Sequence, residues 1–367
     1  MIGWDAIKIA GRGGITLQNK KKTGIHIGVL LLLVVLTFYL LFKDKDLGSI
    51  LHSIGDADPV HIGLGLLLVM AFVCTESIII HYMMRSLKKR SRLASCIKYS
   101  FIGFFFSCIT PSASGGQPAQ LYYMKKDGWD LSVSTLILMI VTVGYKFVLV
   151  FIGAVIFVFH HGLVTRYLGG TMFFFYLGMA LNVICVLGML VLIFEPSLAK
   201  RGAVRGLHIL QKLHIMKSKK DREIRLAQSM ERYHAAAQYF REHKIVIFNV
   251  FLLSLFQRLC LFFVTYLVYG AFGLKGASPV DIVMLQAAIS IGVDMLPLPG
   301  GIGASESLFT IIFKPIFGGS LVLSGMLLSR GISYYGLLLI SAAVTIAAHL
   351  HVLRMERQKE IYKKTLT

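Results

Sequence analysis

The segment Asp294–Glu306 most constrains the fold that this chain can adopt. It lies between two apolar runs, Ile282–Val293 and Ser307–Phe313, and neither run has the roughly 20 residues that a helix needs to cross a bilayer. Two prolines and three glycines prevent a continuous helix, so the chain must turn at Pro297–Gly303. Such irregular backbone is tolerated at membrane depth only where it is buried in protein or lines a water-filled cavity.

A second segment of this kind, Thr110–Gln120, interrupts the apolar run Tyr99–Met124 near its middle. Each arm beside this break has about 12 residues, or roughly 18 Å of helix, which reaches the midplane of a ~30 Å hydrocarbon core but not its far side. The sequence therefore predicts two broken-helix pairs, 99–124 and 281–318, each of which enters the membrane and returns to the same side.

The composition places these breaks in a helical membrane protein. Apolar residues make up 56% of the 367 residues and charged residues 15%, and the net charge is +20. In a membrane protein such an excess of basic residues is typical of loops beside anionic lipid. We find no metal-ligand spacing, no nucleotide-binding glycine loop and no nucleophile–base motif. We therefore expect no metal, no cofactor and no catalytic residue, and the five cysteines are expected to be free thiols.

The distribution of basic residues predicts an all-α, multi-pass protein of the plasma membrane with both termini in the cytoplasm. The pattern gives about six full transmembrane helices and two re-entrant pairs, the first open to the cytoplasm and the second to the outside. This is an inverted-topology repeat, which in transporters places the transported species between two broken helices. The predicted segments are a basic arm at 1–22, a membrane half at 23–194 whose first span is 23–42, a basic loop at 195–244, a second membrane half at 245–352 with a kink near Gly331, and a basic tail at 353–367.

The basic loop carries an amphipathic pattern of its own. Between residues 200 and 244 there are twelve Lys or Arg residues and four acids. Leu226, Met230, Tyr233, Ala237 and Phe240 recur at the spacing of one helix face. A basic amphipathic helix most often lies on the anionic inner leaflet, which we expect for 200–244. No recognition motif supports binding to nucleic acid.

The two breaks supply the candidate substrate-binding residues. Glycines let backbone amides at a helix N-terminus approach an anion such as a phosphodiester, whereas serines either bind a ligand or cap the half-helices. The candidates are Ser112, Ser114, Gly115, Gly116 and Gln117 in the first break and Asp294, Pro299, Gly300, Gly301, Gly303, Ser305 and Glu306 in the second.

Four further ionisable residues, Glu76, Lys146, Arg258 and Arg330, lie inside predicted spans, where charge is costly and therefore suggests function. We expect one of Asp294 and Glu306 to pair with one of these cations and the other to contact a cationic substrate group or a proton. Glu76 and Arg258 are equally compatible with a structural pair between helices.

These segments resemble the flippase-type membrane domain of the lysylphosphatidylglycerol synthase (multiple peptide resistance factor) superfamily. The chain has Gln117 where many relatives carry an acid, and Tyr145-Lys146 where many carry an acidic–basic pair. The resemblance covers most of residues 25–355, and its pieces are Glu76 with Arg85, Thr110-Pro111 with Gly115-Gly116-Gln117, Lys125–Gly128, Leu296–Glu306, Leu327–Arg330 and Tyr334-Tyr335.

The resemblance implies a flippase that moves anionic or aminoacylated phospholipid, of the lysylphosphatidylglycerol type, between leaflets. In this family that activity contributes to resistance against antimicrobial peptides. The alternative is the membrane component of a phosphatidylglycerol lysyltransferase that needs a separate aminoacyl-transferase domain. Because the chain ends at Thr367 and the loop 195–244 is short, we expect transport without enzymatic activity.

Overall fold

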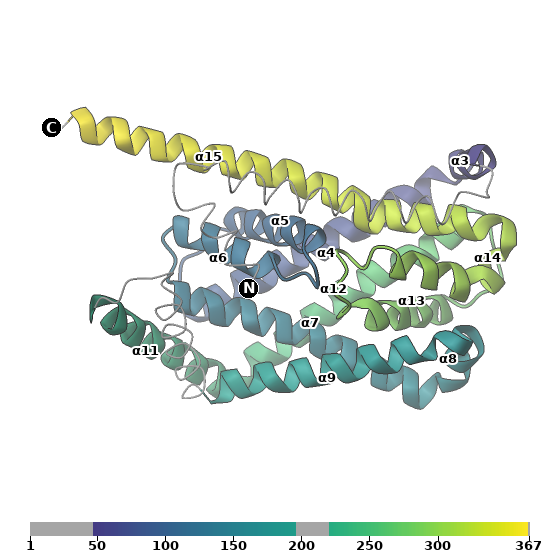
Figure 1. The fold of residues 1–367 in the computed structure, drawn as a ribbon, viewed down its shortest axis with the longest axis horizontal. Coiled ribbons are helices and arrows are strands. Elements are labelled where there is room, and N and C mark those ends of the chain that lie inside the picture. Colours follow the sequence, from purple (N-terminus) through teal and green to yellow (C-terminus); the bar gives the residue numbers. More distant parts are fainter. Residues whose placement is uncertain (1–46, 196–219, 366–367) are drawn as a thin grey trace.

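The computed structural model describes residues 47–195 and 220–365, and these residues form helices and no strand (Figure 1). The basic arm 1–22, the predicted span 23–42 and part of the basic loop, 196–219, lie outside the described residues. Helix α3 (Leu47–Gly55) and helix α8 (His161–Leu168) lie at one end of the bundle. Helix α11 (Lys220–Glu242) and the end of α15 (Leu337–Thr365) lie at the other.

Five helical runs in this described part are long and apolar enough to cross a membrane. They are α4 (Pro59–Ser86), α7 (Leu131–Phe159), α8 with the 3-10 turn η1 (Gly169–Thr171) and α9 (Met172–Phe194), α12 (Lys244–Ala271), and the run from α14 (Ala304–Arg330) into α15 as far as Val352. The prediction of an all-helical, multi-pass membrane protein is confirmed. The predicted number of six spans is not tested, because 23–42 is not described.

Aspartate side chains cap the first turns of α4 and α7. The Asp58 carboxylate accepts a hydrogen bond from the Val60 N–H at 3.0 Å, and Pro59 occupies the first turn of α4. The Asp130 carboxylate caps α7 by accepting the N–H groups of Ser132 and Val133. These caps satisfy donors that the first turn of a helix leaves without a partner.

Both predicted breaks are present. The first separates α5 (Leu93–Ile109) from α6 (Gly116–Lys126), and the second separates α13 (Pro279–Val293) from α14. Within α14 the backbone leaves helical geometry at Gly318, where φ is 77°, three residues after Pro315. The helix that follows the second break therefore ends near Gly318 and is short, like α6 after the first break.

The chain after Gly318 continues through a π-helical turn, η2 (Gly331–Gly336), into α15. This turn lies where the sequence predicted a kink near Gly331. The two halves of the bundle pack in a matched way: α4 lies against α12, α5 packs on α4 as α13 packs on α12, and α15 covers α5 as α7 covers α13.

The apolar face of α11 packs against other helices of the protein. Tyr233, Ala237 and Phe240 are buried, and the Tyr233 hydroxyl donates to the Leu192 carbonyl of α9 at 3.1 Å. Arg232 pairs with Asp130 at the start of α7, at 2.5 Å. The sequence placed this face on the inner leaflet, but neighbouring helices cover it. Contact between the basic residues of the loop and the leaflet stays a prediction.

Candidate functional site

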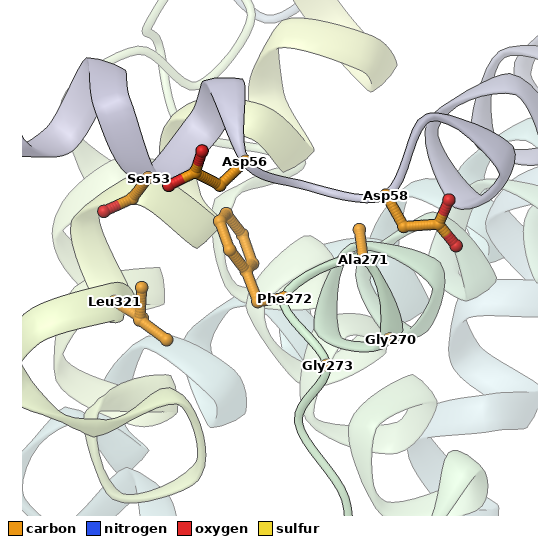
Figure 2. Close-up of a pocket in the computed structure, with 8 residues that line it drawn as sticks. All are labelled: Ser53, Asp56, Asp58, Gly270, Ala271, Phe272, Gly273 and Leu321. Atoms are coloured by element: carbon orange, nitrogen blue, oxygen red, sulfur yellow. The ribbon is translucent and has the colours of Figure 1, made fainter.

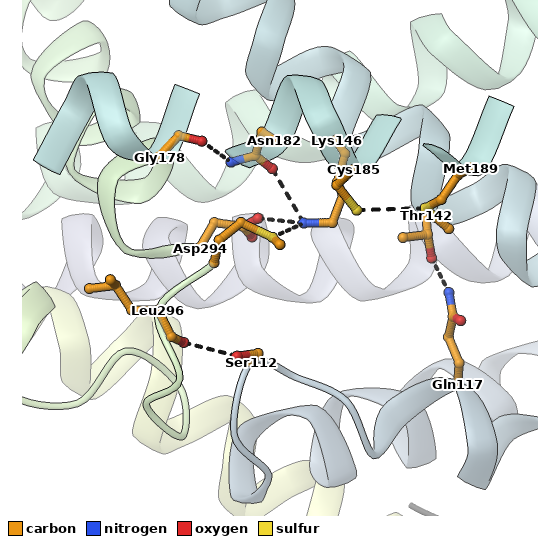
Figure 3. Close-up of polar contacts among 11 residues, drawn as sticks. Ser112, Gln117, Thr142, Lys146, Gly178, Asn182, Cys185, Met189, Asp294 and Leu296 are labelled. Atoms are coloured by element: carbon orange, nitrogen blue, oxygen red, sulfur yellow. Dashed lines mark hydrogen bonds and ion pairs between the residues drawn. The ribbon is translucent and has the colours of Figure 1, made fainter. Parts of the chain in front are cut away.

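The tips of the two broken hairpins contact each other. Pro111 and Pro299 form an isolated antiparallel backbone bridge, and the Ser112 hydroxyl donates to the Leu296 carbonyl at 3.2 Å (Figure 3). Ser112 and Ala113 adopt left-handed backbone angles, with φ of 49° and 54°, which non-glycine residues rarely do. Residues 111–114 are exposed, so the rest of the described chain does not cover the first tip.

A buried ion pair joins α7 to the end of α13. The Lys146 amine lies 2.7 Å from the Asp294 carboxylate and 3.3 Å from the Asn182 side-chain oxygen (Figure 3). The Lys146 side chain is 8% exposed and that of Asp294 is 19% exposed. The Asn182 amide also donates to the Gly178 carbonyl, which fixes its orientation on α9. The lysine is thus held between two neighbouring helices.

A second ion pair closes the other side of the same break. The Arg330 guanidinium lies 2.8 Å from the Glu306 carboxylate, donates to the Gly300 carbonyl at 3.1 Å, and stacks 4.4 Å above the centre of the Tyr334 ring. Glu306 also accepts the Gly303 N–H at 2.7 Å, which caps the first turn of α14. This pair joins the break to η2.

These two pairs correct one expectation. The sequence assigned one of Asp294 and Glu306 to a protein cation and the other to a cationic substrate group or a proton. Both carboxylates are paired within the protein, Asp294 with Lys146 and Glu306 with Arg330. The side chain of Glu306 is only 2% exposed, which leaves Asp294 as the more accessible of the two.

The glycines of the breaks allow close packing within the protein. The Gly115 N–H donates to the Thr110 hydroxyl at 2.8 Å, and the Gly301 N–H donates to the Leu298 carbonyl at 3.2 Å. A Cβ atom on Gly300 would lie 2.2 Å from the Tyr334 ring, and one on Gly116 would lie 2.1 Å from the Ser107 hydroxyl. Some backbone amides that were predicted to bind a phosphate thus already donate hydrogen bonds to acceptors in the protein. The role of the break glycines in substrate binding stays a prediction.

Of the other predicted substrate-binding residues, some are exposed at the tip of the first hairpin and some are buried. Ser114 is exposed at the first tip, whereas Ser305 and Pro299 are buried. Gln117 points into the bundle, where its amide donates to the Leu138 carbonyl at 3.2 Å and to the Thr142 hydroxyl (Figure 3). Gln117 therefore ties α6 to α7.

Glu76 and Arg258 do not form an ion pair with each other. The Glu76 carboxylate accepts the Gln120 amide at 2.8 Å, and Arg258 lies over the rings of Tyr145 and Phe72. Gln120 and Asn182 are not among the residues predicted from the sequence. Both are uncharged amides inside apolar segments, and a search for buried amides alongside charges would have found them.

A pocket of about 500 Å³ lies away from the breaks, at the α3 end of the bundle (Figure 2). Ser53, Asp56, Asp58 and Leu321 line it together with the end of α12. No group of three metal-ligating side chains occurs among residues 47–195 and 220–365. None of the residues that line this pocket belongs to either break.

Comparison with protein families gives one match. The family described as lysylphosphatidylglycerol synthase TM region matches residues 25–341, which include both breaks and all four intramembrane ionisable residues named above. A search of curated proteins found no match.

Proposed function

Because the chain belongs to the family of lysylphosphatidylglycerol synthase transmembrane regions, we propose that it is a flippase-like phospholipid translocator. Its substrate is an anionic or aminoacylated phospholipid, and the head group crosses between the two hairpin tips. The observation that carries the proposal is the contact of two broken hairpins at Pro111 and Pro299, with a buried ion pair on either side of the second break.

The tip contact supports a path that opens and closes. A backbone bridge and the Ser112–Leu296 hydrogen bond join the tips, and a small buried cluster of Cys108, Ile302 and Tyr334 lies beside them. This contact is small: the net hydrogen bond is worth about 0.5–1.5 kcal/mol, and the cluster has three buried residues, so separating the tips disrupts less packing than moving a long helix. The exposed hydroxyls of Ser112 and Ser114 would meet the head group first.

The ion pairs support a polar substrate. Placing a charge at the centre of a membrane helix costs at least about 2.5 kcal/mol, so unneeded charges there are disfavoured. Lys146 and Asp294 offer one cation and one anion next to the tips, which fits a head group that carries a phosphate and an amine. In the arrangement that we propose, the first hairpin opens to the cytoplasm, the second opens to the outside, and both termini are cytoplasmic.

Leaflet transfer in proteoliposomes tests the function. The purified full chain is reconstituted with labelled phosphatidylglycerol, phosphatidylcholine or lysyl-phosphatidylglycerol, and the fraction of label that reaches the second leaflet is followed in time. We expect transfer of the anionic or the lysyl lipid well above that in empty liposomes. Ser112→Ala combined with Ser114→Ala should slow transfer, while Lys275→Gln, an exposed loop charge, should not.

Transfer no faster than in empty liposomes for all three lipids would contradict a translocator. Transfer only after addition of an aminoacyl-transferase and its aminoacyl donor would favour the membrane component of aminoacyl-phospholipid synthesis instead. The two functions therefore give different results in one assay.

A further inference from the structure

Arg258 is an intramembrane cation without a carboxylate partner. It stands at the middle of α12, and its guanidinium lies 4.4 Å from the centre of the Tyr145 ring and 5.5 Å from that of Phe72. Its Nε atom is buried without a hydrogen-bond partner, and no ion pair joins it to another described residue. Lys146 and Arg330, by contrast, each lie within 2.8 Å of a carboxylate oxygen.

Two cations and two acids lie around Tyr145, and only one cation and one acid among them form an ion pair. The Lys146 amine lies 5.1 Å from the centre of the same Tyr145 ring, so two cations share one aromatic side chain. Asp294 pairs with Lys146 alone. Glu76 lies within electrostatic range of Arg258, but its hydrogen bond at 2.8 Å is with Gln120.

We propose that Arg258 binds the phosphate of the phospholipid as the head group crosses the membrane. A guanidinium presents donors in a planar fork that matches two phosphate oxygens, and the Tyr145 ring holds this fork in place. Arg258 is partly exposed as a whole, although its Nε atom is buried. This inference rests on the proposed function and places the phosphate at a side chain, because protein acceptors already bind several amides of the breaks.

A binding measurement tests this role without relying on transport. The full chain in detergent micelles is titrated with short-chain phosphatidylglycerol, with diacylglycerol of the same chain length, and with inorganic phosphate. Arg258→Gln should weaken binding of phosphatidylglycerol at least about tenfold and leave diacylglycerol binding unchanged. Arg258→Lys should give an intermediate loss, since lysine keeps the charge but not the fork. Lys275→Gln, which removes an exposed loop charge, is the matched control.

Competition with inorganic phosphate shows whether the site binds free phosphate or only the phosphate of a lipid head group. Competition with phosphatidylglycerol in the wild type but not in Arg258→Gln supports a phosphate site at this residue. Binding of the lipid without such competition also supports the assignment if it is lost in Arg258→Gln, and shows that the acyl chains are needed. Equal affinity of the wild type and Arg258→Gln for phosphatidylglycerol, or no binding by the wild type, would overturn the proposal.

A purely structural role for Arg258 predicts a different pattern. If the residue serves only to balance Glu76, Arg258→Gln should unfold at a lower temperature, and adding Glu76→Gln should restore both the stability and the lipid affinity. Restored affinity in that double variant would overturn the phosphate site. If Arg258→Gln fails to fold, Tyr145→Leu provides the test, because it removes the ring that orients the guanidinium and keeps the charge. Tyr145→Leu should weaken phosphatidylglycerol binding selectively, and unchanged affinity would count against the site.

The leaflet assay separates this inference from the proposed function. If the wild type transfers no lipid, the proposed translocator function is rejected. Selective loss of phosphatidylglycerol binding in Arg258→Gln would still support the phosphate site. Rapid transfer by the wild type together with equally rapid transfer and binding by Arg258→Gln would keep the translocator and remove the site.

Discussion

At the scale of single residues, the pair of Lys146 and Asp294 holds two costly charges together inside the bundle. Hydropathy marks both residues as unusual, but it does not say which cation meets which acid. That choice depends on where α7, α9 and the end of α13 meet, which local sequence does not encode. The sequence therefore selects these charged residues as a group, whereas the partner of each one follows only from the fold.

Replacing one partner of this ion pair should destabilise the protein more than replacing both partners. Lys146→Met and Asp294→Asn should each lower the free energy of unfolding by about 3 kcal/mol or more, because each leaves a buried charge without its partner. The double variant should recover most of this loss and still fail to transfer lipid. Reversible unfolding in mixed detergent micelles measures the stability.

The pair of Lys98 and Asp127, 2.6 Å apart, is the matched control, because its side chains are 25% and 28% exposed. Lys98→Met should cost no more than about 1 kcal/mol, since water screens this pair. If the single variants at Lys146 and Asp294 prove as mild as Lys98→Met, the pair is not buried as described.

Asp58, outside the membrane spans, should make stability depend on pH. The Val60 N–H, and then the His61 ring, stabilise the carboxylate and hold the pKa of Asp58 below its ordinary value. A lowered pKa means that this stabilisation is present above the unfolded-state pKa of about 3.9 and is lost as pH falls through the folded-state value. The wild type should therefore melt at a higher temperature than Asp58→Asn at pH 6–7. The melting temperatures of the two proteins should converge below about pH 4. Melting curves that stay equally far apart down to pH 3 would contradict this account.

At the scale of elements, the breaks were predictable and their contacts were not. Proline and glycine act locally, so Pro111 and Pro297–Gly303 indicate where helices end whatever surrounds them. An amphipathic face shows only that something apolar must cover it. For α11 the cover is α7 and α9 and not lipid, because the Tyr233 and Arg232 side chains reach groups on those helices.

Gly300 tests whether the shape of the second break matters. Its φ of 58° and a projected Cβ distance of 2.2 Å to the Tyr334 ring both exclude a side chain. Gly300→Ala should destabilise the protein by about 1–3 kcal/mol and reduce lipid transfer, because the break must shift away from Arg330. Gly319→Ala, where no atom lies within 4 Å of the added Cβ, should change neither property. Equal activity of the two alanine variants would show that the transport path tolerates a displaced break.

At the scale of the whole molecule, the two halves of the bundle pack in a matched way, as two structural repeats would. Each half brings a span, a broken hairpin and a second span, and the hairpins meet at their tips. The distribution of basic residues along the sequence predicts that the two repeats have opposite orientations in the membrane, and this orientation stays a prediction. The residues before α3 remain outside this comparison.

Cysteine labelling tests the sidedness directly. On a background without the five native cysteines, Ser114→Cys should react with a membrane-impermeant reagent added from the cytoplasmic side. Pro297→Cys should react from the outside. Both positions are exposed in the fold, so access depends on the side of the membrane and not on burial. Reaction of both from the same side would exclude the inverted arrangement.

The contact between Pro111 and Pro299 also has a consequence for biosynthesis. Pro299 follows Pro111 by 188 residues in the chain. At about 5–20 residues per second, the ribosome completes the second tip about 10–40 s after the first. Throughout that interval the polar backbone of the first hairpin lacks its protein partner, so the insertion machinery, water or lipid head groups must accommodate it. Assembly of this membrane protein is therefore a late event, completed only when the second half of the chain has been made.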